Sequence, residues 1–400
     1  MLSRTTLLAL AASITSSSAA ALLPRHANDT PSTNTPSPGK PYTLISEYKN
    51  TSFFDHFTAF SGLDPTNGHV QYQTLESAAD QSLVGYIYNA TSGERTAYLG
   101  VDAKNSAPDG RKSVRITSKE TFDAGSMIVI DVRHAPSQYG AWPAIWMLGT
   151  GEQDWPANGE SDIMEYVSKD DYNAMTLHTS PGCVVDNITT SAAPGNGSAY
   201  GTKNEKQAGR LQQQGSLTTS DCNAGKGATG CSVKAYNQNT IISDLPSSPN
   251  KRDTTTSTST FSTAGPDFNA QGGAVYVHDW QPSGIAIWSF PRNNLPADLL
   301  ATKPDPSSWT QTPLARFKGS GCDFAQAFQK MQLIINITFC GDWAGKVWAS
   351  SGAKDATGYE TCNEYVAANP EKFEDAYFEI GGVWVYANDG QVPGEGPRYD

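Results

Sequence analysis

Short runs of alternating hydrophobic and polar residues recur along most of the chain, separated by turns rich in glycine, proline and asparagine. Two examples are the runs at 113–118 and 126–132, in which β-branched residues are frequent. Period-two alternation with β-branched residues is typical of strands, and no long helical periodicity competes with it. The pattern predicts an all-β protein in which two sheets pack face to face as a sandwich.

Composition divides the 400 residues into unequal segments. Residues 1–20 have a basic residue at position 4, continue with an apolar run and end in small residues, which predicts a cleaved signal peptide. Residues 21–41 are rich in Pro, Ser and Thr, and we expect a disordered linker or pro-segment. The length and hydrophobic content of 42–390 suit one large domain, followed by a tail at 391–400. A Ser/Thr-rich insert near 246–263 is either a processing site or a passive surface loop.

Three carboxylates fall within six residues of one predicted strand: Glu160, Asp162 and Glu165. Side chains alternate between faces, so Glu160 and Asp162 share a face while Glu165 should point the other way. A single β-bulge at 163–164 would return Glu165 to the face of Glu160. Two glutamates placed in this way have carboxyl groups about 5–5.5 Å apart, the separation that retaining glycosidases use. The alternative is an exposed strand face that happens to be lined with acids.

The flanks of this strand add a resemblance. The segment 160–165, with 142–148 before it and 177–179 after it, resembles glycoside hydrolase family 16. Its E-x-D-x-x-E spacing is similar to that of the laminarinase-type endo-β-1,3(4)-glucanases. The segments 287–292 and 336–345 resemble the fungal secreted members, and the likeness covers 42–390. The resemblance implies a concanavalin A-like jelly roll with an open substrate cleft.

The resemblance also implies roles for the three acids. Glu160 is expected to be the nucleophile of a retaining mechanism, and Glu165 the acid/base that serves both of its steps. Asp162 would lie between them and, through like-charge repulsion, help to keep one of them protonated. The expected activity is endo-hydrolysis of β-1,3 or mixed β-1,3/1,4-glucans through a covalent glycosyl-enzyme intermediate.

Candidate substrate-binding residues are mainly aromatic, because an indole ring offers a flat apolar face to the C–H faces of glucose. His178 matches a position of the family but a lone histidine is often structural. Two predicted strands at 272–280 and 285–290 resemble a hairpin that the family has on the cleft side, and their aromatic residues could face sugar or core. Trp146 is expected to pack in the core. The predicted substrate-binding set is Trp142, Trp155, His178, Trp280, Trp288 and Arg292.

Charge and composition restrict the partners. The net charge is -12 with only 17% charged residues, which argues against nucleic acid and anionic membranes and suits a neutral polymer such as β-glucan. No other stretch has the apolar length of a membrane span, and the end of the sequence predicts no lipid anchor. We expect a secreted extracellular monomer without a redox or nucleotide cofactor. No metal ligands are assigned, although the resemblance allows a structural calcium.

Six cysteines and six Asn-x-Ser/Thr sequons agree with secretion. The cysteines allow three disulfides in fifteen pairings; their clustering favours bonds within the first three or the last three, with Cys222 joined to Cys231. Their spacing does not fit a zinc site. Asn336 follows an apolar run, so its sequon is expected to be buried and unmodified.

Two other functions are compatible with the same residues. A cell-wall glucan transglycosylase would use the same covalent intermediate with a sugar acceptor in place of water. A non-catalytic β-glucan-binding module would share the fold, but such modules can lose the carboxylates that this chain keeps at Glu160 and Glu165. The preferred linkage, the pH optimum and the biological role do not follow from the sequence.

Overall fold

The computed structural model of the protein describes residues 41–151, 153–188, 213–236, 238–241, 258–388 and 392–398. The predicted signal peptide and nearly all of the predicted linker lie outside these residues, and so does most of the predicted insert near 246–263. The end of that insert belongs to strand β16 (Thr258–Phe261), which pairs with β15 (Gln238–Ile241).

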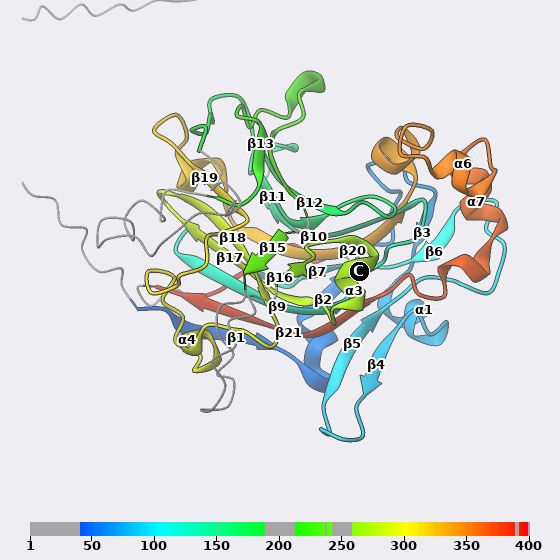
Figure 1. The fold of residues 1–400 in the computed structure, drawn as a ribbon, viewed down its shortest axis with the longest axis horizontal. Helices are drawn as coiled ribbons and strands as arrows, with labels where there is room; N and C mark the ends of the chain where they lie inside the picture. The colour runs from blue at the N-terminus through cyan, green and yellow to red at the C-terminus, as the bar shows by residue number, and fades with distance from the viewer. Residues whose placement is uncertain are drawn as a thin grey trace, which may run out of the picture. The chain divides into compact units, whose positions relative to one another are not determined.

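Two antiparallel sheets of eight strands each confirm the predicted sandwich. In Figure 1, β11 and β12 of one sheet lie above β9 and β21 of the other. Sheet A has the order β19-β18-β17-β9-β21-β5-β4, with β1 also paired to β21. Its strands are β1 (Thr43–Tyr48), β4 (Val84–Tyr88), β5 (Arg95–Leu99), β9 (Ser126–His134), β17 (Ala274–Gln281), β18 (Gly284–Pro291), β19 (Ala315–Lys318) and β21 (Phe378–Ala387).

Sheet B has the order β13-β14-β12-β11-β10-β20-β7-β2. Its strands are β2 (Phe57–Ala59), β7 (Arg115–Ser118), β10 (Ala141–Gly149), β11 (Glu160–Glu165), β12 (Tyr172–His178), β13 (Ser216–Thr219), β14 (Cys231–Tyr236) and β20 (Met331–Phe339). The remaining described strands form short pairs, namely β3 (Val70–Tyr72) with β6 (Arg111–Ser113) and β8 (Glu120–Thr121) with β22 (Gly394–Glu395).

The main core lies between the two sheets and follows from the alternation in the sequence. Ile128 and Ile130 of β9 belong to the same buried cluster as Ile145 and Met147 of β10, and all four are fully buried. Burying one such side chain contributes roughly 1.5–3 kcal/mol to folding. The intervening residues of β9 face the outside of sheet A, where Met127 and others form a second buried cluster. The outer face of sheet A is therefore covered over part of its area, whereas the outer face of sheet B carries the acidic residues.

Helices are short and lie in the connections. One of them, α7 (Cys362–Ala368), begins with a capping box between Thr361 and Glu364. None of the helices in the described part of the chain has the length and apolar character needed to cross a membrane. The others are α1 (Leu75–Asp80), α3 (Gly265–Ala270), α4 (Ala297–Leu300), α5 (Phe324–Ala327), α6 (Ala353–Thr357), the 3-10 helices η1 (Asn50–His56), η2 (Gly225–Gly227) and η4 (Pro370–Phe373), and the π-helix η3 (Gly341–Gly345).

All six cysteines are paired. Cys222–Cys231 confirms one predicted bond, and Cys340–Cys362 joins two of the last three cysteines as the clustering favoured. The third bond, Cys183–Cys322, crosses between the two groups over 139 residues. Two groups of three cannot pair completely within themselves, so three disulfides require one bond of this kind.

Candidate active site

The predicted bulge in β11 is present. Against β10, Ile145 pairs with Met164 and Trp146 pairs with Asp162, so Ile163 is the extra residue. Ile163 and Met164 are both fully buried, although strict alternation would expose one of them. The bulge thus buries two consecutive apolar side chains and changes the direction of every side chain that follows.

The register puts the three acids on one face. Glu160, Asp162 and Glu165 lie opposite Leu148, Trp146 and Ala144, which are alternate residues of β10. Directly opposed residues of an antiparallel pair have their side chains on the same side of the sheet. The opposite face of β10 carries core residues, so the acids project from the outer face of sheet B.

A glycine fixes where β11 begins. Gly159, directly before Glu160, has φ +80°, a left-handed conformation that favours glycine. A side chain there would also collide with backbone, because a Cβ would lie 2.5 Å from the carbonyl oxygen of Ala327. The Asn-Gly sequence before the acids therefore has a structural role in turning the chain into the strand.

Each glutamate receives a hydrogen bond from a tryptophan. Trp142 Nε1 donates to Glu165 Oε1 over 2.8 Å, and Trp155 Nε1 donates to Glu160 Oε2 over 2.7 Å. Trp142 comes from β10 beside the acids, and Trp155 from the turn before β11. The Trp155 side chain is 53% exposed, so its ring remains open to a ligand.

His178 completes the group from β12, where it pairs with Glu160 in register. Its Nε2 atom lies 3.2 Å from Asp162 Oδ2 and 3.7 Å from Glu160 Oε1. Burial lowers the pKa of His178, but the hydrogen bond to Asp162 and the charges of the acids outweigh burial and raise that pKa to about 9. An imidazolium cation therefore faces Asp162 and Glu160 at neutral pH.

Both glutamates have a raised pKa. Burial, and then the charge of Asp162, raises the pKa of Glu160 to about 7, while His178 and the Trp155 indole oppose the rise. Burial and the charge of Asp162 also raise the pKa of Glu165, well above its usual range. The pair is thus suited to hold a proton near neutral pH.

Glu160, Asp162 and His178 bring donor atoms within 4.8 Å of one another, and they are the only set of three such side chains that does so among the described residues. The histidine nitrogen that would bind a cation already contacts both carboxylates. We interpret the trio as part of the electrostatics of the glutamate pair.

Several residues beside the acids were not predicted. The Arg115 guanidinium, on β7, lies between the rings of Phe60 and Trp146 at 4.7 and 4.9 Å. Trp343 meets Trp142 edge to face at 5.7 Å. Arg115 is in an alternating strand and has no local sequence signal. Trp343 lies in the segment 336–345 that carried the resemblance, which could have pointed to it.

Trp146 corrects one expectation, because it does not pack in the core. It shares the outer face of sheet B with Trp142, and its Nε1 donates to Asn336 Oδ1 over 2.6 Å. Asn336 is itself 7% exposed and also donates to the Tyr72 hydroxyl, which confirms that this sequon is buried. The spacing of four residues between the two tryptophans is even, so one strand carries both on one face.

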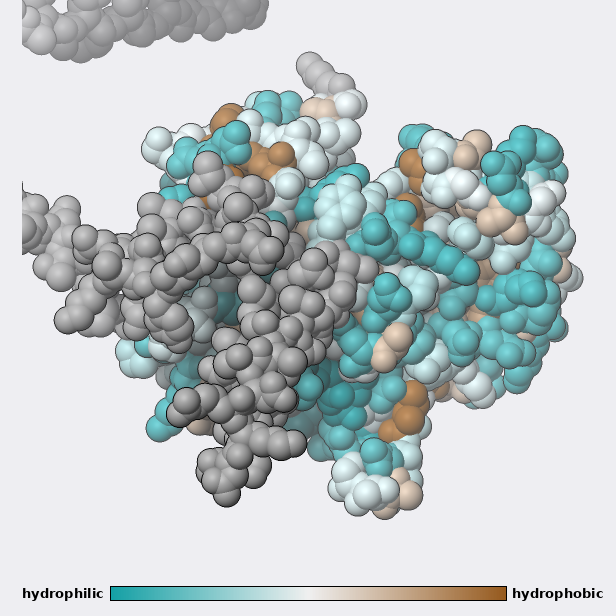
Figure 2. Space-filling view, in the orientation of Figure 1, coloured by the Kyte–Doolittle hydropathy of each residue, from teal (hydrophilic) through white to brown (hydrophobic). Residues whose placement is uncertain are grey.

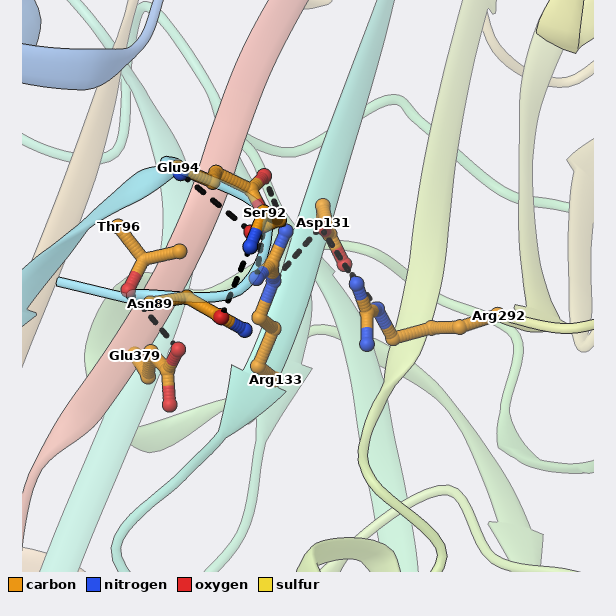
Figure 3. Close-up of polar contacts among 8 residues, drawn as sticks. All are labelled: Asn89, Ser92, Glu94, Thr96, Asp131, Arg133, Arg292 and Glu379. Atoms are coloured by element: carbon orange, nitrogen blue, oxygen red, sulfur yellow. Dashed lines mark hydrogen bonds and ion pairs between the residues drawn. The ribbon is translucent and has the colours of Figure 1, made fainter. Parts of the chain in front are cut away.

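Three predicted substrate-binding residues are not at this site, and for them the expectation is corrected. The hairpin β17–β18 belongs to sheet A, not to the cleft side. Trp280 is 1% exposed and packs between the sheets, and Trp288 lies in the buried cluster outside sheet A. Figure 3 shows Arg292 reaching Asp131 of β9, with Nε 2.6 Å from Asp131 Oδ1. The hairpin itself was correctly predicted, but its sheet was not.

The surface above the acids is recessed. In Figure 2 the outline dips between the part that carries β13 and the part that carries α6, and Figure 1 shows β10, β11 and β12 running between these parts. The side of the molecule that faces the viewer in Figure 2 carries mainly hydrophilic coloured residues, with apolar ones only in small groups. Paired carboxyl groups on one face of a β-sandwich are the arrangement that glycoside hydrolases as a class use.

Comparison with known proteins agrees with this class of protein. A family model described as the XgeA-like, catalytic GH16 domain matches residues 57–245 and 212–386. The chain is 34% identical to endo-1,3(4)-beta-glucanase xgeA of Emericella nidulans, covering 89% of this chain and 49% of that protein. A probable endo-1,3(4)-beta-glucanase of Aspergillus clavatus is 38% identical, with 86% and 46% covered. The chain belongs to the XgeA-like family of GH16 catalytic domains, and it spans about half the length of these two relatives.

Solved structures give the same relationship. Laminarinase 16A of Phanerochaete chrysosporium, crystallised with two β-glucans in its donor and acceptor sites, is 33% identical with a TM-score of 0.68. The match covers 86% of this chain and 99% of that one. An elongating GH family 16 β-1,3-glucosyltransferase is 32% identical with a TM-score of 0.67, covering 86% and 100%.

Proposed function

We propose that this chain is an endo-acting retaining β-glucanase that hydrolyses β-1,3 or mixed β-1,3/1,4-glucans. The observation that carries the proposal is the pair Glu160 and Glu165 on one face of β11, each bound by an indole and each with a raised pKa. The names of the relatives support the substrate class, and the open recess supports attack within a chain.

In the first step the Glu160 carboxylate attacks the anomeric carbon and the glycosidic C–O bond breaks. Glu165 donates its proton to the departing sugar oxygen, and a covalent glycosyl-enzyme forms. The raised pKa of Glu165 supports its role as the acid, because that group must be protonated when the leaving oxygen departs. His178 stabilises the ionised form of Glu160 from 3.7 Å.

In the second step Glu165 is ionised and takes a proton from a water molecule, which attacks the anomeric carbon and releases Glu160. Two displacements return the β-configuration. Asp162 holds His178 in place and keeps Glu165 protonated at the start of the cycle. Two carboxyl groups and water are sufficient for both steps, so we propose that no cofactor takes part.

Three disulfides and the signal-like residues 1–20 support secretion.

The purified protein should be incubated with laminarin, mixed-linkage β-glucan and xyloglucan, and reducing ends, product sizes and the first anomer should be followed. We expect rapid shortening of either of the first two glucans with a β-anomer product, and their relative rates report the linkage preference. An α-anomer product would refute the retaining mechanism. Binding of glucan without any product would refute the enzyme and leave a recognition module.

A second candidate is glucan transfer, in which a sugar hydroxyl replaces water in the second step. The similarity to an elongating GH16 glucosyltransferase supports it. The same incubation separates the two functions, because transfer redistributes chain lengths without producing new reducing ends.

A further inference from the structure

The ladder between β11 and β12 stops where the bulge begins. Its register contains only Glu160 with His178 and Ser161 with Leu177. Beyond Ser161 the bulge shifts the backbone of β11, so the groups that would bond to β12 need other partners. Buried backbone N–H and C=O groups are nearly always paired, because leaving one without a hydrogen bond costs about 1–3 kcal/mol.

The side chain of Asn173, on β12, supplies these partners. Its Oδ1 accepts a hydrogen bond from the Glu165 backbone N–H over 2.8 Å, and its Nδ2 donates to the Ile163 carbonyl oxygen over 2.8 Å. The two backbone groups also fix which way the amide points, since one is a donor and the other an acceptor. One side chain thus spans the bulge from its extra residue to the second glutamate.

Water cannot take over these bonds without rearrangement. Asn173 is fully buried, and so are Ile163 and Met164 between its two contacts. Glu165 is therefore held at two places, its backbone by Asn173 and its carboxyl group by Trp142. If the bulge relaxed by one residue, Glu165 would turn away from the face of Glu160.

We propose that Asn173 is a positioning residue for Glu165, and the inference rests on the proposed function of Glu165 as acid/base. By bonding both sides of the bulge, Asn173 keeps the Glu165 carboxyl group on the face of Glu160 and Asp162. Its loss impairs proton transfer to the leaving oxygen and leaves nucleophilic attack by Glu160 intact, because Glu160 precedes the bulge and pairs with His178 in the regular ladder.

The test compares two substrates that differ in their need for an acid. Laminarin has a sugar leaving group that must be protonated. A 2,4-dinitrophenyl β-laminaribioside loses a stable phenolate, so its C–O bond breaks on attack by Glu160 without a proton. Steady-state turnover of laminarin and single-turnover release of dinitrophenolate with enzyme in excess are measured for wild type, N173A, N173D and E165Q.

Asn269 offers a matched control. Its side chain also bridges a backbone N–H and a carbonyl, both of Ala135, over 2.9 and 2.8 Å, and it lies on α3 outside the site. N269A therefore removes the same two kinds of bond. Thermal unfolding of N173A and N269A reports the structural cost of each loss. N173D keeps the shape of the side chain and the oxygen that accepts from the Glu165 N–H, but it places a second oxygen against the Ile163 carbonyl oxygen. It is the alternative variant if N173A does not fold.

We expect N173A and N173D to lose about 100-fold in kcat on laminarin, as a displacement of about 1 Å can do. Their rate of dinitrophenolate release should stay within about tenfold of that of wild type. E165Q should show the same combination of a large loss on laminarin and a small loss on the dinitrophenyl substrate, because it loses only general acid catalysis. N269A should keep both rates. Equal loss on both substrates, or no loss on laminarin, would overturn the role of Asn173 while E165Q still supports the proposed function. Full laminarin turnover by E165Q would overturn both.

Discussion

The outer faces of the two sheets each carry buried acids, but the acids have different partners. On sheet A, Asp131 contacts both Arg133 and Arg292, and Arg133 also binds Glu94 (Figure 3). The hydrogen bond from Arg133 lowers the pKa of Glu94. On sheet B, Glu160 and Glu165 have indole donors and a neighbouring Asp162, and their pKa values rise. The comparison teaches that an arginine partner keeps a half-exposed carboxylate ionised, whereas burial beside a second acid raises the proton affinity of a carboxylate.

The largest effect is expected for E160Q, which removes the proposed nucleophile. Turnover of laminarin should fall by about 10⁴-fold or more, as for other residues that act directly in catalysis. The fold should survive. The pKa of Glu160 is raised from its usual value of 4.5 to about 7 in the folded protein. Wild type therefore loses stability as the pH rises between these two values, because Glu160 ionises less readily when folded, and glutamine avoids this loss. In thermal unfolding at pH 5 and pH 8, the unfolding temperature of E160Q relative to that of wild type should be higher at pH 8 than at pH 5. Near wild-type turnover would exclude Glu160 as nucleophile.

W155F should shift the pH profile of catalysis. The Trp155 indole stabilises ionised Glu160, so its removal raises the pKa of that carboxyl and moves the acid limb of kcat/KM to higher pH. Because Trp155 is half-exposed, we expect the loss of this one hydrogen bond to shift the acid limb by about one pH unit or less. Trp384 provides the matched control on sheet A, because its Nε1 donates to Glu47 over 2.6 Å. An identical shift in W384F would show that the effect is not local to the site.

D131N should weaken folding while leaving catalysis unchanged, the reverse of E160Q. Removing the charge of Asp131 leaves Arg133 and Arg292 without their shared carboxylate, and we expect a loss of roughly 2 kcal/mol in the free energy of unfolding. Arg292 is 36% exposed, so R292A should cost about 1 kcal/mol or less. Denaturant unfolding and the KM for laminarin check both variants. A rise in KM for R292A would restore the original expectation that Arg292 binds substrate.

The smallest effect concerns two sequons, one on each side of the sandwich. Asn89 is exposed at the turn between β4 and β5 of sheet A, while Asn336 is buried beside Trp146 and Tyr72 in sheet B. Protein secreted from a glycosylating host should carry a glycan on Asn89 and none on Asn336, as peptide mass spectrometry would reveal. N89Q should then lose that glycan and retain full activity. A glycan on Asn336 would contradict the described packing of the site.

Local pattern in the sequence determined the strands, the sandwich and the geometry of the acids. Alternation reports which face of a strand is buried, and the odd spacing between Asp162 and Glu165 required a bulge if all three acids were to share a face. The Cys222–Cys231 bond is also local, so the short spacing of its cysteines was enough to predict it.

Only the tertiary structure decided which sheet each strand joins and what surrounds each carboxyl. The hairpin β17–β18 was predicted correctly, yet its place in sheet A removes Trp280, Trp288 and Arg292 from the site. Arg115 and Trp343 come to lie beside the site from distant parts of the sequence, and Asn173 bonds to the bulge from the neighbouring strand β12. Alternation shows that a side chain faces inward or outward but not what it faces, because strand order is set by long-range pairing. The proton affinities of Glu160 and Glu165 depend on those neighbours, and so could not be derived from the strand alone.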